Sequence, residues 1–69
     1  MTFYDFIQTF RDDNTPLGKL AHWIEKDDFF PKDETAGHNI LEYFQSLHNL
    51  EHEIMETAKR SIAVFEQFF

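Results

Sequence analysis

The sequence predicts a compact all-α domain built from four short helices. Three observations lead to this fold class. Apolar side chains recur at intervals of three and four residues, the spacing of one helical face, over most of the chain. Start signals, above all Thr15-Pro16, divide that pattern into separate segments. No stretch shows the alternation of a strand between turn residues. With 69 residues, the chain is expected to form a single domain over residues 1–69.

The first helix is predicted from Phe3 to Arg11. Thr2 is a good N-cap, and Asp5 three residues later completes a start that resembles a capping box. Four apolar residues then share one helical face: Phe3, Phe6, Ile7 and Phe10. The polar run Asp12-Asp13-Asn14 is prone to turns and should end the helix.

The second helix should begin at Thr15-Pro16, a capping hydroxyl followed by proline at the first helical position. Its buried stripe is Leu17, Leu20, Ala21 and Ile24, with Trp23 partly exposed at the edge. Pro31 disfavours the helical conformation in the residue before it, so this helix should end near Asp28. Phe30 stands at that break and is predicted to turn into the core.

Thr35 is the predicted cap of the third helix, which should reach about Leu47 through a face of Ile40, Tyr43, Phe44 and Leu47. We place a break over residues 46–49, with Asn49 capping the fourth helix. A single long bent helix is the alternative. The predicted inner face of the fourth helix is Leu50, Ile54, Ala58, Phe65 and Phe68. Glu56 and Arg60 form an i, i+4 pair on its outer face, whereas Ala58 and Ser61 are small enough for close helix packing.

Composition limits the partners. The formal net charge is −7, and the six basic residues are scattered, which disfavours binding to a phosphate backbone. There is no cysteine, so disulfides are excluded, and nine phenylalanines supply the mass of the core instead. No stretch is apolar enough to span a membrane, and the N-terminus has no basic region of a signal peptide. We expect a cytoplasmic protein without membrane partners.

The motifs resemble those of the YozE family of small bacterial proteins, found mostly in Gram-positive Firmicutes. The matching residues are Phe3-Tyr4, Arg11, Leu20-Ala21, Asp27, Phe30-Pro31-Lys32, His38, Ile40 and Tyr43. The resemblance covers about the first two-thirds of the chain. It departs at Phe29, where the family has a small polar residue, and in residues 62–68. The resemblance implies a fold like that of the sterile alpha motif (SAM-like) and brings no activity and no catalytic residues.

No residue pattern indicates an enzyme or a cofactor. His48 and His52 have the i, i+4 spacing by which two imidazoles on one helix share a metal, but both point away from the apolar face, and we assign no metal site. The acidic pairs Asp12-Asp13, Asp27-Asp28 and Asp33-Glu34 lie at predicted helix ends, where turn chemistry explains them. With two glycines in the chain, no phosphate-binding loop is expected.

Four aromatic residues are poorly explained by a monomer core and form the candidate interaction surface: Trp23, Phe29, Phe68 and Phe69. Aromatic residues dominate the energetics of protein interfaces. The first hypothesis is therefore a non-enzymatic module that binds an unknown protein partner or a second copy of itself. The alternative is a nucleic-acid-associated SAM-like domain, which the acidic charge disfavours.

Overall fold

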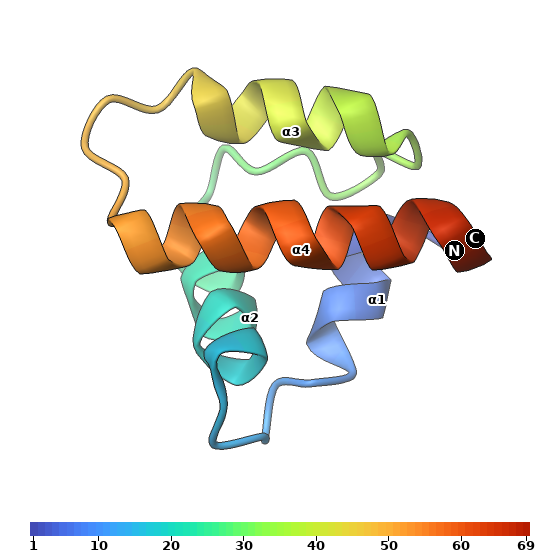
Figure 1. The fold of residues 1–69 in the computed structure, drawn as a ribbon, viewed down its shortest axis with the longest axis horizontal. Helices are drawn as coiled ribbons and strands as arrows, with labels where there is room; N and C mark the ends of the chain where they lie inside the picture. The colour runs from blue at the N-terminus through green and yellow to red at the C-terminus, as the bar shows by residue number, and fades with distance from the viewer.

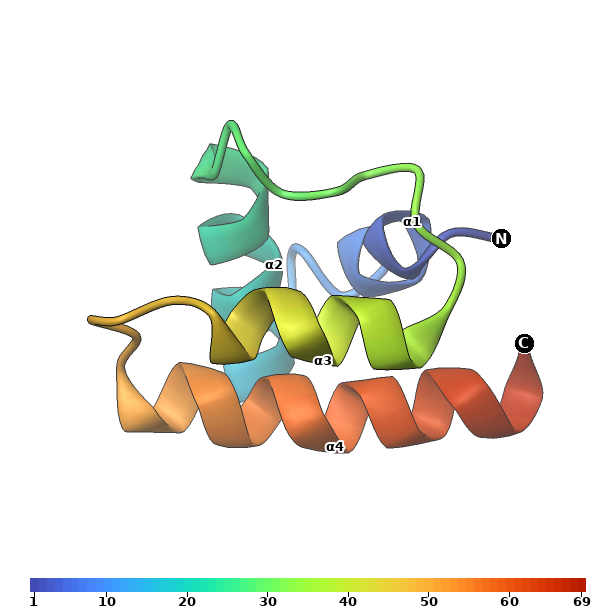
Figure 2. The ribbon, with the colours of Figure 1, turned by 90° about the horizontal axis from the view of Figure 1, so that it is seen from above.

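The computed structural model describes residues 1–69 and contains four helices, as the sequence predicts. They are α1 (Phe3–Gln8), α2 (Pro16–Lys26), α3 (Gly37–Gln45) and α4 (His52–Phe68). Helices α3 and α4 lie side by side and antiparallel, and α2 crosses them steeply (Figures 1 and 2). Both termini lie at the same end of the molecule (Figure 2). No helix is long and apolar enough to cross a membrane.

All four helices contribute to one core. Twelve buried apolar residues form a single cluster, and the largest of them are fully enclosed: Phe3, Phe44, Phe65, Ile7, Leu20, Ile24 and Ile40. Phe30 joins this cluster from the loop after α2, with only 4% of its surface exposed. Its ring contacts Phe3 of α1 and Tyr43 of α3, at centroid distances of 6.5 and 5.4 Å. The prediction that Phe30 turns into the core is confirmed.

Helix α1 is shorter than predicted. Its start is as expected, because the Thr2 hydroxyl accepts a hydrogen bond from the Asp5 backbone N–H at 3.1 Å. Regular helix stops at Gln8, not Arg11. After Gln8 the backbone forms hydrogen bonds of the 3₁₀ type, in which each N–H binds the carbonyl three residues earlier. The Phe10 N–H binds the Ile7 carbonyl, and the Arg11 N–H binds the Gln8 carbonyl. Phe10 is therefore only partly buried.

Helix α2 begins as the sequence predicts and ends one residue before Asp27. The Thr15 hydroxyl accepts a hydrogen bond from the Gly18 backbone N–H at 3.4 Å. Gly18 is buried because the loop before α2 packs directly on it. A Cβ atom at this position would lie 1.9 Å from the Asp13 carbonyl oxygen. The glycine that looks like a weak helix residue is thus required for close approach of two backbone segments.

The predicted caps of α3 and α4 are both wrong. Ala36 occupies the N-cap position of α3 without a side-chain bond, and Thr35 makes no capping contact. The Glu34 carboxylate binds the exposed N–H groups of Thr35 and Ala36 instead, both at 3.0 Å. At α4 the N-cap position belongs to Glu51, not Asn49, because the break between α3 and α4 extends further than predicted. The break itself is confirmed, which rules out one long bent helix.

Several predictions for α4 also need correction. Leu50, predicted on its inner face, lies in the loop before the helix and is only partly buried. Phe68 is 68% exposed, whereas Phe65 in the same turn of α4 is buried against Phe3 and Phe6 of α1. The inner face is completed by residues that the sequence prediction left out, namely Thr57 and Ile62. Glu56 pairs with Lys59 at 3.5 Å, not with Arg60. The small residues Ala58 and Ser61 are both buried, as close packing of helices requires.

Candidate functional site

The four aromatic residues of the predicted interaction surface do not form one surface. Trp23 is partly buried, with its ring 5.8 Å from that of Phe44, and lines a shallow hollow beside the α3–α4 loop. Phe29 is 87% exposed in the loop after α2. Phe68 and Phe69 are 68% and 64% exposed at the C-terminal end of α4. The end of α2 and the end of α4 lie on opposite sides of the molecule (Figure 2).

Phe68 and Phe69 lie beside a groove that sequence reasoning did not predict. This groove, which we call the α1–α4 groove, has a volume of about 370 Å³. Its walls come from α1, the loop after it, the start of α2 and the middle of α4. The lining residues are Phe6, Phe10, Asp13, Thr15, Pro16, Leu17, Thr57, Arg60, Ser61 and Val64. It is the one hollow of the molecule with an extended aromatic and aliphatic wall.

The aromatic wall of the groove continues onto the end of α4. The Phe6 ring lies 5.5 Å from both the Phe10 ring and the Phe69 ring. Val64 is 45% exposed, and Phe68 follows it by one helical turn on the same side of α4. The groove and the exposed side chains of Val64, Phe68 and Phe69 therefore form one contiguous apolar face. One feature of the sequence could have indicated this face. Val64 and Phe68 are apolar residues at i, i+4 on α4, and they lie to one side of its buried stripe.

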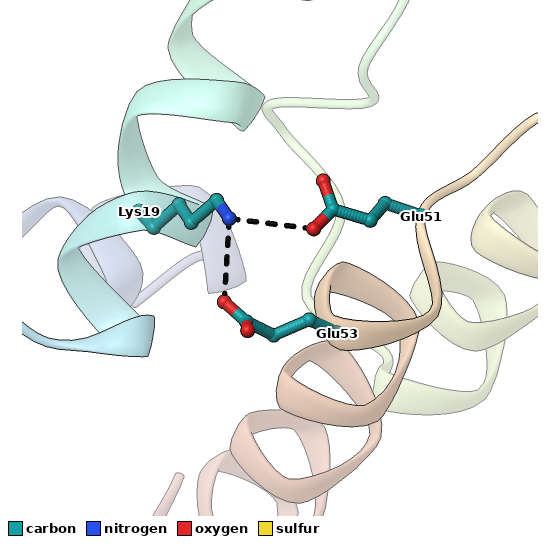
Figure 3. Close-up of polar contacts among 3 residues, drawn as sticks. All are labelled: Lys19, Glu51 and Glu53. Atoms are coloured by element: carbon teal, nitrogen blue, oxygen red, sulfur yellow. Dashed lines mark hydrogen bonds and ion pairs between the residues drawn. The ribbon is translucent and has the colours of Figure 1, made fainter.

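A second and larger hollow is lined mainly by polar and charged residues. It has a volume of about 650 Å³ and lies on the other side of the loop from Asp13 to Pro16. Lys19 and Glu53 line it, and Lys19 of α2 binds Glu51 and Glu53 at the start of α4, at 3.4 and 3.3 Å (Figure 3). The hydrogen bond to Glu53, then that to Glu51, raises the pKa of Lys19 above its ordinary value. These ion pairs connect α2 to the start of α4, and they leave the Lys19 ammonium paired within the chain.

The basic side chains are mostly engaged within the chain. Arg11 binds Glu25 at 2.9 Å, and Lys59 binds Glu56. The Lys32 ammonium lies over the Tyr4 ring, 5.2 Å from its centroid. Arg60 is exposed, lines the α1–α4 groove and forms no ion pair. A cluster of free cations, which a nucleic-acid phosphate would need, is not assembled on any face.

The two histidines with metal-ligand spacing lie in different elements. His48 belongs to the loop between α3 and α4, whereas His52 is the first residue of α4, and both are exposed. Their i, i+4 spacing would place them on one face only in a continuous helix. No group of three or more candidate ligands converges anywhere.

Two of the paired carboxylates hold the loop between α2 and α3. Asp27 accepts hydrogen bonds from the Phe29 backbone N–H at 3.1 Å and from the Tyr43 hydroxyl. Partial burial, then the bond to Asp27, raises the pKa of Tyr43 to about 12. The backbone N–H of Ala36 lowers the pKa of Glu34, with further help from the Asn39 amide at 3.1 Å. These are the structural roles predicted for acids at helix ends.

Five of the residues that carried the family resemblance lie around Phe30, directly or through one neighbour: Phe3, Tyr4, Asp27, Lys32 and Tyr43. Phe3 and Tyr4 pack on its ring from α1, and Tyr43 packs on it from α3. Asp27 binds the Tyr43 hydroxyl, and Lys32 covers Tyr4. These positions therefore maintain the packing of the long loop against the helices, and they do not line the α1–α4 groove.

The four helices around one aromatic core define a small all-α domain. The family model described as YozE SAM-like fold matches residues 2–67. The chain therefore belongs to the YozE SAM-like family. The match extends through α4, beyond the two-thirds of the chain over which the motifs were recognised. No curated protein and no solved structure matched the chain.

Proposed function

We propose that this protein is a non-enzymatic protein-interaction module whose contact face is the α1–α4 groove together with Val64, Phe68 and Phe69. The observation that carries the proposal is the contiguous apolar face at the end of α4. A small acidic protein has little reason to expose adjacent aromatic residues next to an apolar hollow unless they are covered by a partner. We place this activity in the bacterial cytoplasm, in accord with the cysteine-free composition.

Phe29 is the second exposed aromatic residue, and its surroundings differ. The hollow at its loop is lined by six residues, only one of them hydrophobic, and four of the six are charged. Charged residues are depleted from the centres of protein interfaces. The groove is therefore the better contact face, although Phe29 is the more exposed side chain.

Site-specific photo-crosslinking in living bacteria tests the proposal. A photoreactive phenylalanine analogue is placed at position 64, position 29 or position 63, one at a time. Ala63 is exposed, precedes Val64 by one residue and does not line the groove, so it serves as the matched control. We expect a protein adduct from position 64 and none from position 63. An adduct from position 29 alone would move the contact to the loop, and the absence of any adduct would contradict the proposed function.

A further inference from the structure

The charges in the α1–α4 groove identify the kind of partner that fits it. Asp13 and Arg60 are the only charged residues among its lining residues, and they have opposite sign. The groove wall is thus formally neutral in a chain whose net charge is −7. Neither residue takes part in any of the four ion pairs of the chain, and they do not pair with each other. Two unpaired opposite charges therefore border one apolar hollow.

A partner with charges of one sign matches this arrangement poorly. A basic segment would pair with Asp13 but meet Arg60, and an acidic segment would do the reverse. An unpaired or like-charged contact inside an interface is costly. A surface that carries both signs is matched by its own image after a two-fold rotation. An axis that passes midway between Asp13 and Arg60 brings each group to its opposite on the other copy.

The shape of the face is self-complementary in the same way. The hollow is walled by Phe6 and Leu17. On its α4 side Val64 lines the edge and is 45% exposed, and Phe68, one helical turn further, is 68% exposed. A two-fold contact pairs a projection on one copy with a hollow on the other. It would cover these exposed apolar side chains and place aromatic residues at the centre of the interface, where they contribute most to binding.

We propose that the α1–α4 groove is occupied by a second copy of this chain in a two-fold symmetric dimer. Val64 and Phe68 of each copy pack into the groove of the other, and Arg60 of each copy pairs with Asp13 of the other. The inference rests on the proposed function, which it deepens by naming the partner. It requires no residue of the Phe30 cluster, which remains inside each copy.

The dimer has a distinctive dependence on salt. Two copies of net charge −7 repel each other, and the repulsion is screened within about 10 Å at 0.1 M salt. The contact itself is mainly apolar and contains only two reciprocal ion pairs. Association between copies is therefore expected to strengthen as salt rises from low concentration. Binding of a basic partner to this acidic chain would weaken over the same range.

Analytical ultracentrifugation of the purified chain, up to about 1 mM, tests the dimer at low and moderate salt. We expect reversible dimerisation that strengthens with salt. Val64→Glu should weaken it about tenfold or more, since it places a charge in the apolar centre of the contact. Ala63→Glu adds the same charge to the same helix on the outer side and should leave the dimer unchanged. Circular dichroism verifies that both variants are folded.

Charge reversal tests the pairing of the two copies. Arg60→Asp and Asp13→Arg should each weaken dimerisation, because each places like charges opposite one another. The double variant carrying both changes should restore it to within a few-fold of the original. A chain that stays monomeric at every salt concentration would overturn the inference. So would a dimer that Val64→Glu does not weaken, or a double variant in which dimerisation is not restored. A strict monomer that still yields an adduct with a different protein from position 64 overturns the dimer alone. If the purified chain dimerises but no photo-crosslinked adduct forms in bacteria, only the proposed cellular function is overturned.

Discussion

At the scale of single residues, the Tyr43 hydroxyl is the contact that joins α3 to the end of α2. It donates a hydrogen bond to Asp27, whose other oxygen holds the Phe29 backbone N–H. One carboxylate therefore fixes both the turn after α2 and the position of α3. Hydrogen bonds to charged acceptors are stronger than neutral ones, although partial exposure of this pair reduces the net gain.

We predict that Tyr43→Phe lowers the free energy of unfolding by about 1 kcal/mol. Tyr4→Phe is the matched control, because the Tyr4 hydroxyl forms no hydrogen bond within the chain, and it should have a smaller effect. The measurement is urea unfolding at neutral pH. Equal losses in the two variants would show that the Asp27 contact adds no stability.

The same residue gives a prediction at alkaline pH. The pKa of Tyr43 is raised from 10.0 to about 12 in the folded protein. A raised pKa stabilises the fold fully below pH 10 and loses its contribution as the pH rises through 12. Ultraviolet absorbance titration should contain a tyrosinate step near pH 12, and Tyr43→Phe should remove that step. A step near pH 12 that remains in the variant would contradict the assignment to Tyr43.

At the scale of the helices, the ends were harder to predict than the faces. Apolar periodicity correctly placed the centres of the buried sides of α2 and α3, because burial depends on positions within one helix. At the edges it was less accurate: Leu17 and Tyr43 are only partly buried, and Leu47 lies beyond Gln45, where α3 ends. The cap of α3 depends on Glu34, which lies outside the helix and accepts from two backbone N–H groups. Thr35 is an equally good cap by residue type. The path of the loop determines whether Glu34 or Thr35 caps the helix, and that path is held by the hydrogen bond from the Phe3 N–H to the Glu34 carbonyl.

The Glu34 cap predicts a stability difference that depends on pH. Backbone N–H groups lower the pKa of Glu34 below its ordinary value of 4.5. A lowered pKa stabilises the fold above that value, and the contribution is lost as the pH falls through the folded pKa. Glu34→Ala should therefore reduce the melting temperature at neutral pH, and its deficit should shrink in acid. Asp33→Ala removes the adjacent exposed carboxylate and should show no such trend in thermal melts followed by circular dichroism.

The two glycines, both inside helices, should respond in opposite ways to alanine. A Cβ on Gly18 would meet the Asp13 and Phe10 carbonyl oxygens, which are backbone atoms and cannot move aside. Gly18→Ala should cost about 1–3 kcal/mol from overpacking. A Cβ on Gly37 would meet the Cγ atom and the carboxyl group of Glu66, an exposed side chain that can turn away by a change of rotamer. Gly37→Ala should be close to neutral, since alanine favours helix. Urea unfolding of both variants measures the two changes in stability. A Gly18→Ala variant as stable as the original chain would contradict the packing of the loop on α2.

At the scale of the whole molecule, the sequence predicted the core better than the candidate contact face. The four-helix architecture and the role of Phe30 follow from periodicity and from Pro31. The α1–α4 groove does not, because it is built from residues of three separate segments, such as Phe6, Leu17 and Val64. No spacing rule connects positions so distant in the chain. Phe6 and Phe10 were predicted on the inward stripe of the first helix, but both are only partly buried, and Phe10 lies beyond the end of α1.

The adjacent Phe29 and Phe30 provide the test of how the molecule holds together. Phe30 is 4% exposed and contacts aromatic rings of both α1 and α3, whereas Phe29 is 87% exposed. Truncation of a buried phenylalanine costs about 3–5 kcal/mol. Domains of this size have a total stability of about 3–10 kcal/mol. Phe30→Ala should therefore leave the chain largely or partly unfolded at room temperature.

Phe29→Ala is the matched control for this prediction, because it makes the same change one residue away in the same loop. It should unfold at nearly the same urea concentration as the original chain, since it removes a side chain that already faces water. Far-ultraviolet circular dichroism and urea unfolding of the two variants give the comparison. If the two substitutions cost the same, the loop does not pack through Phe30, and the four helices must be held together without it. If only Phe30→Ala unfolds the chain, Phe29 is free to be substituted in interaction experiments without loss of the fold.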